Sequence, residues 1–189
     1  MGMKCAILNC AVAAFAGFFA LAPAQASNVA QSEEALELLE ELRAPDQPRW
    51  QRIERQIGRL WSRSGSASAD LLLQRGREAM ERGDTSAAID HFSALIDHAP
   101  DFAEGYHARA TAWFMDGRLG LAMDDLQQTL SLNPMHFSAL AGVGRILEDI
   151  EAYDRAYRAY KAANAIHPHR DDVRTAIERL ERRLSGTEI

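Results

Sequence analysis

Cysteine is nearly absent from this chain of 189 residues, because both copies, Cys5 and Cys10, lie within the first ten positions. The rest of the sequence has no thiol. This excludes disulfide bonds, cysteine nucleophiles, thiolate-bound metals and c-type haem attachment from the remainder. A chain of this length can nevertheless bury enough apolar surface to fold without disulfide bonds.

Basic residues are outnumbered by acidic residues. The chain has 21 lysine and arginine residues against 27 aspartate and glutamate residues, and its formal net charge is −6. Beyond residue 26 the balance is 20 against 27, a net charge of −7, and Lys161 is the one lysine. Because nonspecific nucleic-acid binding depends on a basic surface, this composition argues against a nucleic-acid partner.

Long apolar stretches are missing except at the N-terminus. Residues 1–4 are a short basic start, residues 5–22 are almost wholly apolar, and Ala24-Gln25-Ala26 has the small-x-small pattern of a processing site. This layout predicts a secretory signal peptide over residues 1–26 that is cleaved before Ser27. We therefore expect a secreted, periplasmic protein with no stable membrane insertion after cleavage.

Two other uses of the N-terminal segment stay open. The apolar run is about as long as the shortest membrane-spanning helices, so it could be kept as an uncleaved anchor. Pro23 and the processing site argue against that reading. A lipid attached at Cys10 is the second alternative, but Asn9 replaces the small residue expected before such a cysteine.

Motifs for catalysis are missing as well. No Gly-x-Ser-x-Gly sequence occurs, and Gly142-Val143-Gly144 has no preceding strand of the kind that a dinucleotide-binding loop requires. Carboxylate pairs such as Asp124-Asp125 have the ordinary spacing of a helix surface. We expect no enzymatic activity and no cofactor.

The six histidines do not form a recognisable metal motif. His91 and His98 are seven residues apart on one expected helix, which is too far for a pair of ligands on adjacent turns. The histidines on either side of Pro168 have no third ligand near them in the sequence. We expect His107 and His136 to stand alone, and we predict no metal site.

What the sequence does contain is a repeat. Pro100, Pro134 and Pro168 are 34 residues apart, and the same types of residue recur at matching distances before each proline. Small residues recur where two helices must approach closely, and a bulky residue recurs where the gap must be filled. A period of this length is typical of stacked helical hairpins. The predicted packing positions are Gly76, Ala88, Phe92 and Pro100 in the first copy, Ala110, Ala122, Leu126 and Pro134 in the second, and Gly144, Ala156, Tyr160 and Pro168 in the third.

This pattern resembles the tetratricopeptide repeat (TPR) family. The resemblance implies an all-α TPR solenoid of three helix-turn-helix repeats over residues 67–168, at about 69–102, 103–136 and 137–170. We expect residues 169–189 to form a C-terminal capping helix and tail, since an open solenoid end needs a polar cover. Gly83 and Gly117 suit a left-handed turn inside the first two hairpins, whereas the third hairpin has Glu151 at this place.

The repeat pattern is absent from residues 27–66, where we expect a helix pair and a serine-rich joint. The first helix is predicted to begin after a cap at Ser32, and the second carries Trp50 and Trp61 on one face. We expect this pair to pack on the first repeat as an N-terminal cap. The alternative is that the two tryptophans form a docking surface for a partner.

In the TPR family, the first helix of each hairpin lines a concave groove that holds peptides or partner helices. The lysine–asparagine clamp by which some members hold a terminal carboxylate has no match here, which favours an internal segment or an amphipathic helix as ligand. One alternative is that the protein's own N-terminal or C-terminal helices fill the groove. The resemblance places these residues in it: Leu73, Arg77, Met80 and Glu81; His107, Thr111, Phe114 and Met115; and Ala141, Arg145, Glu148 and Asp149.

These features together predict a periplasmic protein–protein interaction module or assembly adaptor, whose partners are other proteins or peptides. By resemblance to small periplasmic TPR proteins, the expected role is in envelope assembly. Examples are holding an unfolded client, such as an apocytochrome awaiting haem, or bridging parts of the cell-wall or outer-membrane machinery. The alternative is a self-associating structural scaffold, held together through Trp50 and Trp61 or through the open solenoid ends, with no exchangeable ligand.

Overall fold

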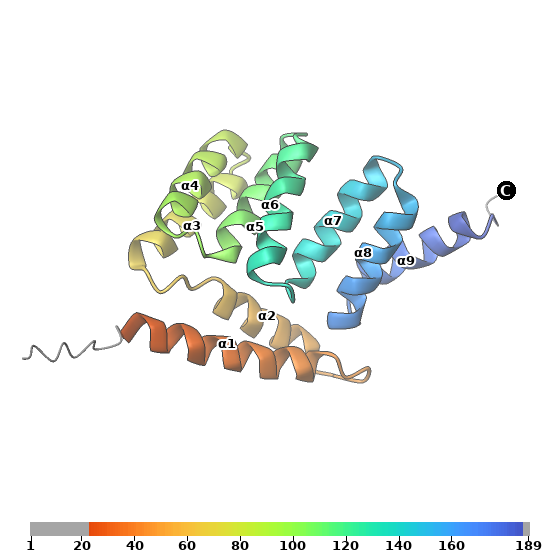
Figure 1. The fold of residues 1–189 in the computed structure, drawn as a ribbon, viewed down its shortest axis with the longest axis horizontal. Coiled ribbons are helices and arrows are strands. Elements are labelled where there is room, and N and C mark those ends of the chain that lie inside the picture. The colour runs from red at the N-terminus through yellow and green to blue at the C-terminus, as the bar shows by residue number, and fades with distance from the viewer. Residues whose placement is uncertain (1–22, 187–189) are drawn as a thin grey trace, which may run out of the picture.

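The computed structural model describes residues 23–186, and all regular structure within that range is helical (Figure 1). Two helices form an N-terminal hairpin, three further hairpins follow, and a single helix comes after them. The helices are α1 (Pro23–Leu42), α2 (Trp50–Trp61), α3 (Ala67–Glu81), α4 (Thr85–His98), α5 (Ala103–Met115), α6 (Leu119–Leu132), α7 (Phe137–Asp149), α8 (Tyr153–Ile166) and α9 (Asp171–Leu184).

The three hairpins from α3 to α8 stack side by side, which confirms the expected all-α solenoid (Figure 1). The two helices of each hairpin are in contact, and the second helix of one hairpin also contacts the first helix of the next. Each hairpin therefore buries its apolar residues against a neighbour as well as within itself. This arrangement leaves α3, α5 and α7 to line one face of the array.

Inside two of the hairpins, a glycine lets the helices approach and an aromatic ring fills the space. A Cβ atom on Gly76 would lie 2.2 Å from Cε1 of Phe92, and one on Gly144 would lie 2.9 Å from Cδ1 of Tyr160. The second hairpin has Ala110 at this position, in one core cluster with the smaller Leu126. A larger side chain on one helix is thus matched by a smaller one on the other. Ala88, Ala122 and Ala156 are fully buried in the same seams.

Each of these hairpins turns through a residue with left-handed backbone. The φ angle is +75° at Gly83 and at Gly117, and +61° at Glu151. The hydrogen bonds also match, since the amides of Gly83 and Glu151 each donate at 2.9 Å to a carbonyl three residues earlier. The third hairpin therefore keeps the turn of the other two, although it places a residue with a Cβ atom in a region that favours glycine.

The N-terminal hairpin does not cap the first repeat, so that prediction is wrong. It lies along the edge of the array where the hairpins are joined to one another (Figure 1). Leu39, Ile53 and Ile57 form one buried cluster with Phe137 at the start of α7 and Ile166 at the end of α8. The apolar stripe of the hairpin showed that it needs a partner, and the hairpin finds that partner in Phe137 and Ile166, which it buries at the edge of the third repeat.

α1 begins at Pro23, nine residues before the predicted cap. Alanine and glutamine have high helix propensity and proline suits the first helical position, so the helix extends back beyond Ser32. Residues 1–22 of the expected signal peptide lie outside the described part of the chain. The last four residues of that expected segment form the first turn of α1.

α9 covers the far side of α8. Val173, Ala176, Ile177 and Leu180 on one side of α9 are buried and belong to one core cluster with residues of α7 and α8. The opposite side is polar, as expected for a helix at the end of a solenoid. Across residues 23–186, no helix combines the length and the apolar character that crossing a membrane requires.

Candidate binding groove

Two hollows lie next to each other along the face formed by α3, α5 and α7. The first hollow, of about 300 Å³, lies between α3 and α5, and the second hollow, of about 190 Å³, lies between α5 and α7. His107 and Thr111 line both, so the two hollows share a rim. The first is also lined by Arg77, Met80, Glu81, Phe92, Glu104 and Ala108, and the second by Ala110, Phe114, Leu126, Ser138, Gly142, Arg145 and Ile146.

The protein's own terminal helices do not fill these hollows. Among the residues that the structure describes, none from α1, α2 or α9 lines either one. The alternative of a self-filled groove therefore does not hold at this place. Both hollows combine apolar walls with a few polar side chains, which is the usual character of a ligand site.

The two arginines of the groove differ in how free they are. The side chain of Arg145 is 64% exposed and pairs with Asp149, one turn further along α7, at 3.3 Å. Because an exposed ion pair contributes little, a ligand carboxylate can replace Asp149 at small cost. Arg77 instead forms an ion pair with Glu104 and donates a hydrogen bond to Oγ of Ser62 at 3.0 Å. Arg77 is therefore engaged in holding the protein's own side chains.

A cluster of polar side chains stands at the first turn of α5. Oε2 of Glu104 lies 3.1 Å from Nε2 of His136 and 3.4 Å from Nδ1 of His107, while Arg77 holds the other carboxylate oxygen. Burial alone would raise the pKa of Glu104. The contacts with His107 and His136 outweigh burial and hold this pKa well below its usual range, so the carboxylate is ionised.

His136 connects this cluster to the start of α7. Its Nδ1 accepts a hydrogen bond from the amide of Ala139 at 3.2 Å, and thereby caps the helix. The proton of the neutral ring is then on Nε2, which donates to Glu104. Burial lowers the pKa of His136, although the hydrogen bond to Glu104 acts in the opposite direction, and the ring is neutral at pH 7.

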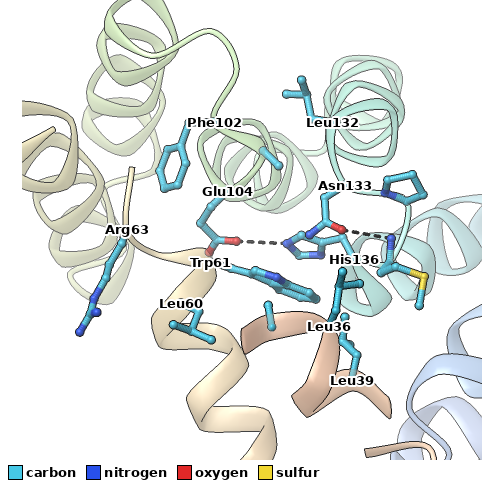
Figure 2. Close-up of a pocket in the computed structure, with 14 residues that line it drawn as sticks. Leu36, Leu39, Leu60, Trp61, Arg63, Phe102, Glu104, Leu132, Asn133 and His136 are labelled. Carbon is cyan, nitrogen blue, oxygen red and sulfur yellow. Dashed lines mark hydrogen bonds and ion pairs between the residues drawn. The ribbon is translucent and has the colours of Figure 1, made fainter. Parts of the chain in front are cut away.

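A third hollow, of about 360 Å³, opens between the N-terminal hairpin and the repeats, beside Glu104 and His136 (Figure 2). Trp61 forms part of its wall and stacks on His136 with ring centroids 4.5 Å apart. At the other end of α2, Trp50 stacks on His169 at 5.8 Å. Both tryptophans are half-buried and pack on histidines of the repeats, so they do not form a fully exposed docking surface.

Comparison with known proteins identifies the repeats. The chain is 31% identical over 134 residues to a TPR repeat-containing protein of Rhizobium etli, in a match that covers 71% of this chain and 66% of the relative. The chain belongs to the tetratricopeptide repeat family. It is also 26% identical over 121 residues to the small glutamine-rich tetratricopeptide repeat-containing protein 2 of Mycosarcoma maydis, of which it spans 34%. No protein-family model matches the chain.

A solved TPR structure has the same fold. The first TPR of Spaghetti (RPAP3), bound to the HSP90 peptide SRMEEVD, aligns with a TM-score of 0.61 and 20% identity. The alignment covers 64% of this chain and 95% of the other. At this level of identity the likeness concerns the fold alone.

Seven of the twelve predicted TPR groove residues line the two hollows, and five do not: Leu73, Met115, Ala141, Glu148 and Asp149. Ala141 is buried in the core cluster that α7 forms with α8 and α9. Leu73 is 2% exposed and packs with Phe92 in the core between α3 and α4, so its assignment to the groove is wrong. Its place on α3 faces the partner helix rather than the open side. Met115 is 59% exposed but lies at the end of α5, outside both hollows. The predicted residues that do line the hollows are Arg77, Met80, Glu81, His107, Thr111, Phe114 and Arg145.

The structure gives Glu148 a role other than that of a free groove carboxylate. Arg179 of α9 donates to both of its oxygens, at 2.8 and 2.9 Å, and the hydroxyl of Tyr160 donates to it at 3.2 Å. The side chain is 17% exposed. Glu148 thus ties α7 to α8 and α9, a role that sequence spacing did not reveal because its partners lie 31 and 12 residues away.

The expectation that His107 and His136 stand alone is also wrong. Their ring centroids are 4.3 Å apart, although 29 residues separate them in the sequence. The repeat period could have shown this proximity, because it places the start of one first helix beside the start of the next. Glu104, which lies between both rings and one turn before His107, was not predicted to have any role.

Proposed function

We propose that this TPR protein binds a segment of a partner protein along α3, α5 and α7. The observation that carries the proposal is the pair of adjacent hollows with a shared rim at His107 and Thr111. Concave sites with apolar walls and a few polar groups are the usual places for ligands. Two such hollows in a row suit two apolar side chains of one bound segment.

The walls indicate the chemistry of that segment. Met80 and Phe92 provide an apolar wall in the first hollow, and Phe114 and Ile146 do so in the second. A methionine side chain adapts to ligands of different shape. Arg145 borders the second hollow and can bind a carboxylate. We expect the preferred segment to carry two spaced apolar side chains, with an acidic side chain close to the one in the second hollow.

The solved relative supports a peptide as the class of ligand, since the RPAP3 domain has this fold and is bound to a peptide. The mode of binding is expected to differ. Lys161, the one lysine beyond residue 26, lies on α8 and lines neither hollow. An internal segment with apolar anchors is therefore favoured over a terminal carboxylate held by lysines.

The test selects peptides from a displayed library with the purified chain and measures their affinity by fluorescence anisotropy. Thr111→Arg places a long side chain on the shared rim, and Thr111 is exposed, so the fold should be kept. Gln127→Arg introduces the same side chain at an exposed position of α6 and serves as the matched control. We expect Thr111→Arg to raise the dissociation constant at least tenfold, and Gln127→Arg to leave it unchanged.

Two results would contradict the proposal. One is a library that yields no sequence with spaced apolar residues. The other is an equal loss of affinity for both variants, which would place the peptide outside the groove or reveal a general effect of added positive charge. Circular dichroism of both variants should show unchanged helicity.

We further propose that this binding takes place in the periplasm. The support is the signal-peptide layout of residues 1–26. Cleavage before Ser27 would remove only four residues of α1 and would leave the buried side chains from Ala35 onward in place. Mass spectrometry of fractionated cells should find a chain that starts at Ser27 outside the cytoplasm. An intact chain in the cytoplasmic fraction would refute this location.

A further inference from the structure

We propose that Glu104, His107 and His136 form a binding site for one divalent transition-metal ion of the zinc type, at the rim of the groove. Each residue offers one ligand atom, and the three atoms all lie within 4.8 Å of one another. They come from two rigid elements, since Glu104 and His107 are one turn apart on α5 and His136 precedes α7.

The distances fit a small ion. Zinc binds nitrogen and carboxylate oxygen at roughly 2.0–2.1 Å, so two ligands of a tetrahedral site are about 3.3 Å apart. Oε2 of Glu104 is 3.1 Å from Nε2 of His136 and 3.4 Å from Nδ1 of His107. Two edges of the tetrahedron are therefore already near their required length, and the third pair of ligand atoms lies within 4.8 Å.

One of the three ligand atoms has no other partner. Nδ1 of His107 is buried and makes no hydrogen bond, and its contact with Glu104 at 3.4 Å lacks hydrogen-bond geometry. A buried polar atom without a partner is uncommon and calls for an explanation. A metal ion between His107 and Glu104 would supply the missing partner. Arg77 binds only the other carboxylate oxygen, so Oε2 stays available to the ion.

The ligand set indicates the class of ion. Two imidazoles and one carboxylate suit zinc and neighbouring transition metals, whereas calcium and magnesium prefer oxygen ligands. Three protein ligands leave a fourth position open. Glu104 and His107 both line the first hollow, so water or a side chain of the bound segment can reach that position from the groove.

Binding at His136 has a structural consequence that can be observed. Its Nε2 carries the ring proton because Nδ1 accepts from the amide of Ala139. A metal on Nε2 displaces this proton, and the neutral ring then carries its proton on Nδ1. The hydrogen bond from Ala139 is lost, so the amide signal of this residue in NMR spectra should shift when the ion binds.

The experiment uses the full chain, purified without a histidine tag and stripped with a chelator. Titration with Co²⁺ should give visible absorption bands of tetrahedral type that saturate at one ion per chain, and Zn²⁺ should displace the cobalt. His107→Ala should weaken Zn²⁺ binding at least tenfold in calorimetry. His98→Ala removes an exposed histidine of α4 and should leave the affinity unchanged.

His107→Ala is the deciding variant because His136 also caps α7 and Glu104 also binds Arg77, so their replacement can unfold the chain. The proposal is overturned if the wild-type chain binds no Zn²⁺ in stoichiometric amount. It is equally overturned if folded His107→Ala binds as tightly as the wild type, or if the amide of Ala139 does not respond. Peptide binding by the metal-free chain is measured separately, so failure of this site leaves the proposed groove function intact.

Discussion

The two tryptophans of α2 pack on histidines at opposite ends of the helix. Trp61 stacks on His136 with ring centroids 4.5 Å apart, and Trp50 meets the edge of His167 at 5.6 Å. Both histidines are almost wholly removed from solvent, at 2% and 0% exposure. They differ in their polar partners, since both ring nitrogens of His136 are hydrogen-bonded and neither ring nitrogen of His167 is.

This difference shows two outcomes of burying the same side chain. A buried polar group with partners defines the geometry around it, whereas one without partners costs about 1–3 kcal/mol. His136 fixes the start of α7 against Glu104 and the hairpin. His167 makes no hydrogen bond, although its Nε2 lies 3.6 Å from Oε1 of Glu54 on α2. The hydrogen-bonded contact at that end comes from His169, whose Nε2 lies 3.0 Å from the carbonyl oxygen of Ala44. The hairpin is therefore held more firmly at Trp61 than at Trp50.

The largest effect is expected from removing the firmer contact. Trp61→Ala should lower the free energy of unfolding by about 3 kcal/mol, because it deletes a large side chain that packs on His136 and Phe137. Urea denaturation followed by circular dichroism measures the loss. Trp50→Ala is the matched variant and should lower the free energy of unfolding by less than Trp61→Ala does. An equal or larger loss for Trp50→Ala would contradict the conclusion that the hairpin is held more firmly at Trp61.

The second-largest effect is expected from acid, which should lower the free energy of unfolding through His167 at the Trp50 end of α2. Burial lowers the pKa of His167 from 6.5 to about 4, and the positive charges of Arg170 and His169 act in the same direction. As the pH falls from about 6.5 to about 4, the unfolded chain takes up a proton that the folded chain does not. The free energy of unfolding should be highest above pH 6.5 and decline across this range, with His167 accounting for at most about 2 kcal/mol after solvent screening.

Denaturation at a series of pH values tests this. His167→Leu, which has no proton to gain, should show a shallower decline between pH 6.5 and 4 than the wild type. A decline of the same slope in both proteins would mean that other groups, His136 among them, carry the acid sensitivity.

The smallest effect is a gain in stability. His167→Leu removes two nitrogens that make no hydrogen bond from a buried site between Trp50 and Phe137, and should stabilise the chain by about 1 kcal/mol at pH 7. His136→Leu is the control at the other end and should destabilise, because it removes the hydrogen bond to Oε2 of the buried Glu104 and leaves the amide of Ala139 without its acceptor. Thermal unfolding of both variants measures the two changes in stability. Two changes of the same sign would show that hydrogen bonding does not distinguish the two histidines.

The repeat was readable from the sequence because its signals are local. Gly76 and Phe92 are 16 residues apart and face each other across one hairpin, so their recurrence at a fixed period reports directly on packing. The hydrogen-bonded turn at Glu151 could also be placed from its position in the period, although the residue type departs from glycine. The sequence predicted less well which side of a helix a residue faces, since Leu73 was placed in the groove and is buried against α4.

The place of the N-terminal hairpin was not readable. Its apolar stripe around Ile53 and Ile57 showed that it must be covered, but not whether the first repeat or the edge of the second and third repeats covers it. Apolar burial depends on area and has no direction along the sequence, so several surfaces could have served. The side chains of Phe137 and Ile166, presented together at that edge, made the choice.

The sequence by itself determined the helical hairpins, their number and their seams, because a small residue opposite a large one is a local requirement of helix packing. Only the tertiary structure decided where the N-terminal hairpin lies and which side chains meet at the groove rim. Glu104, His107 and His136 come within reach of one another because neighbouring repeats are stacked, and their partners are set by distance in space rather than along the chain.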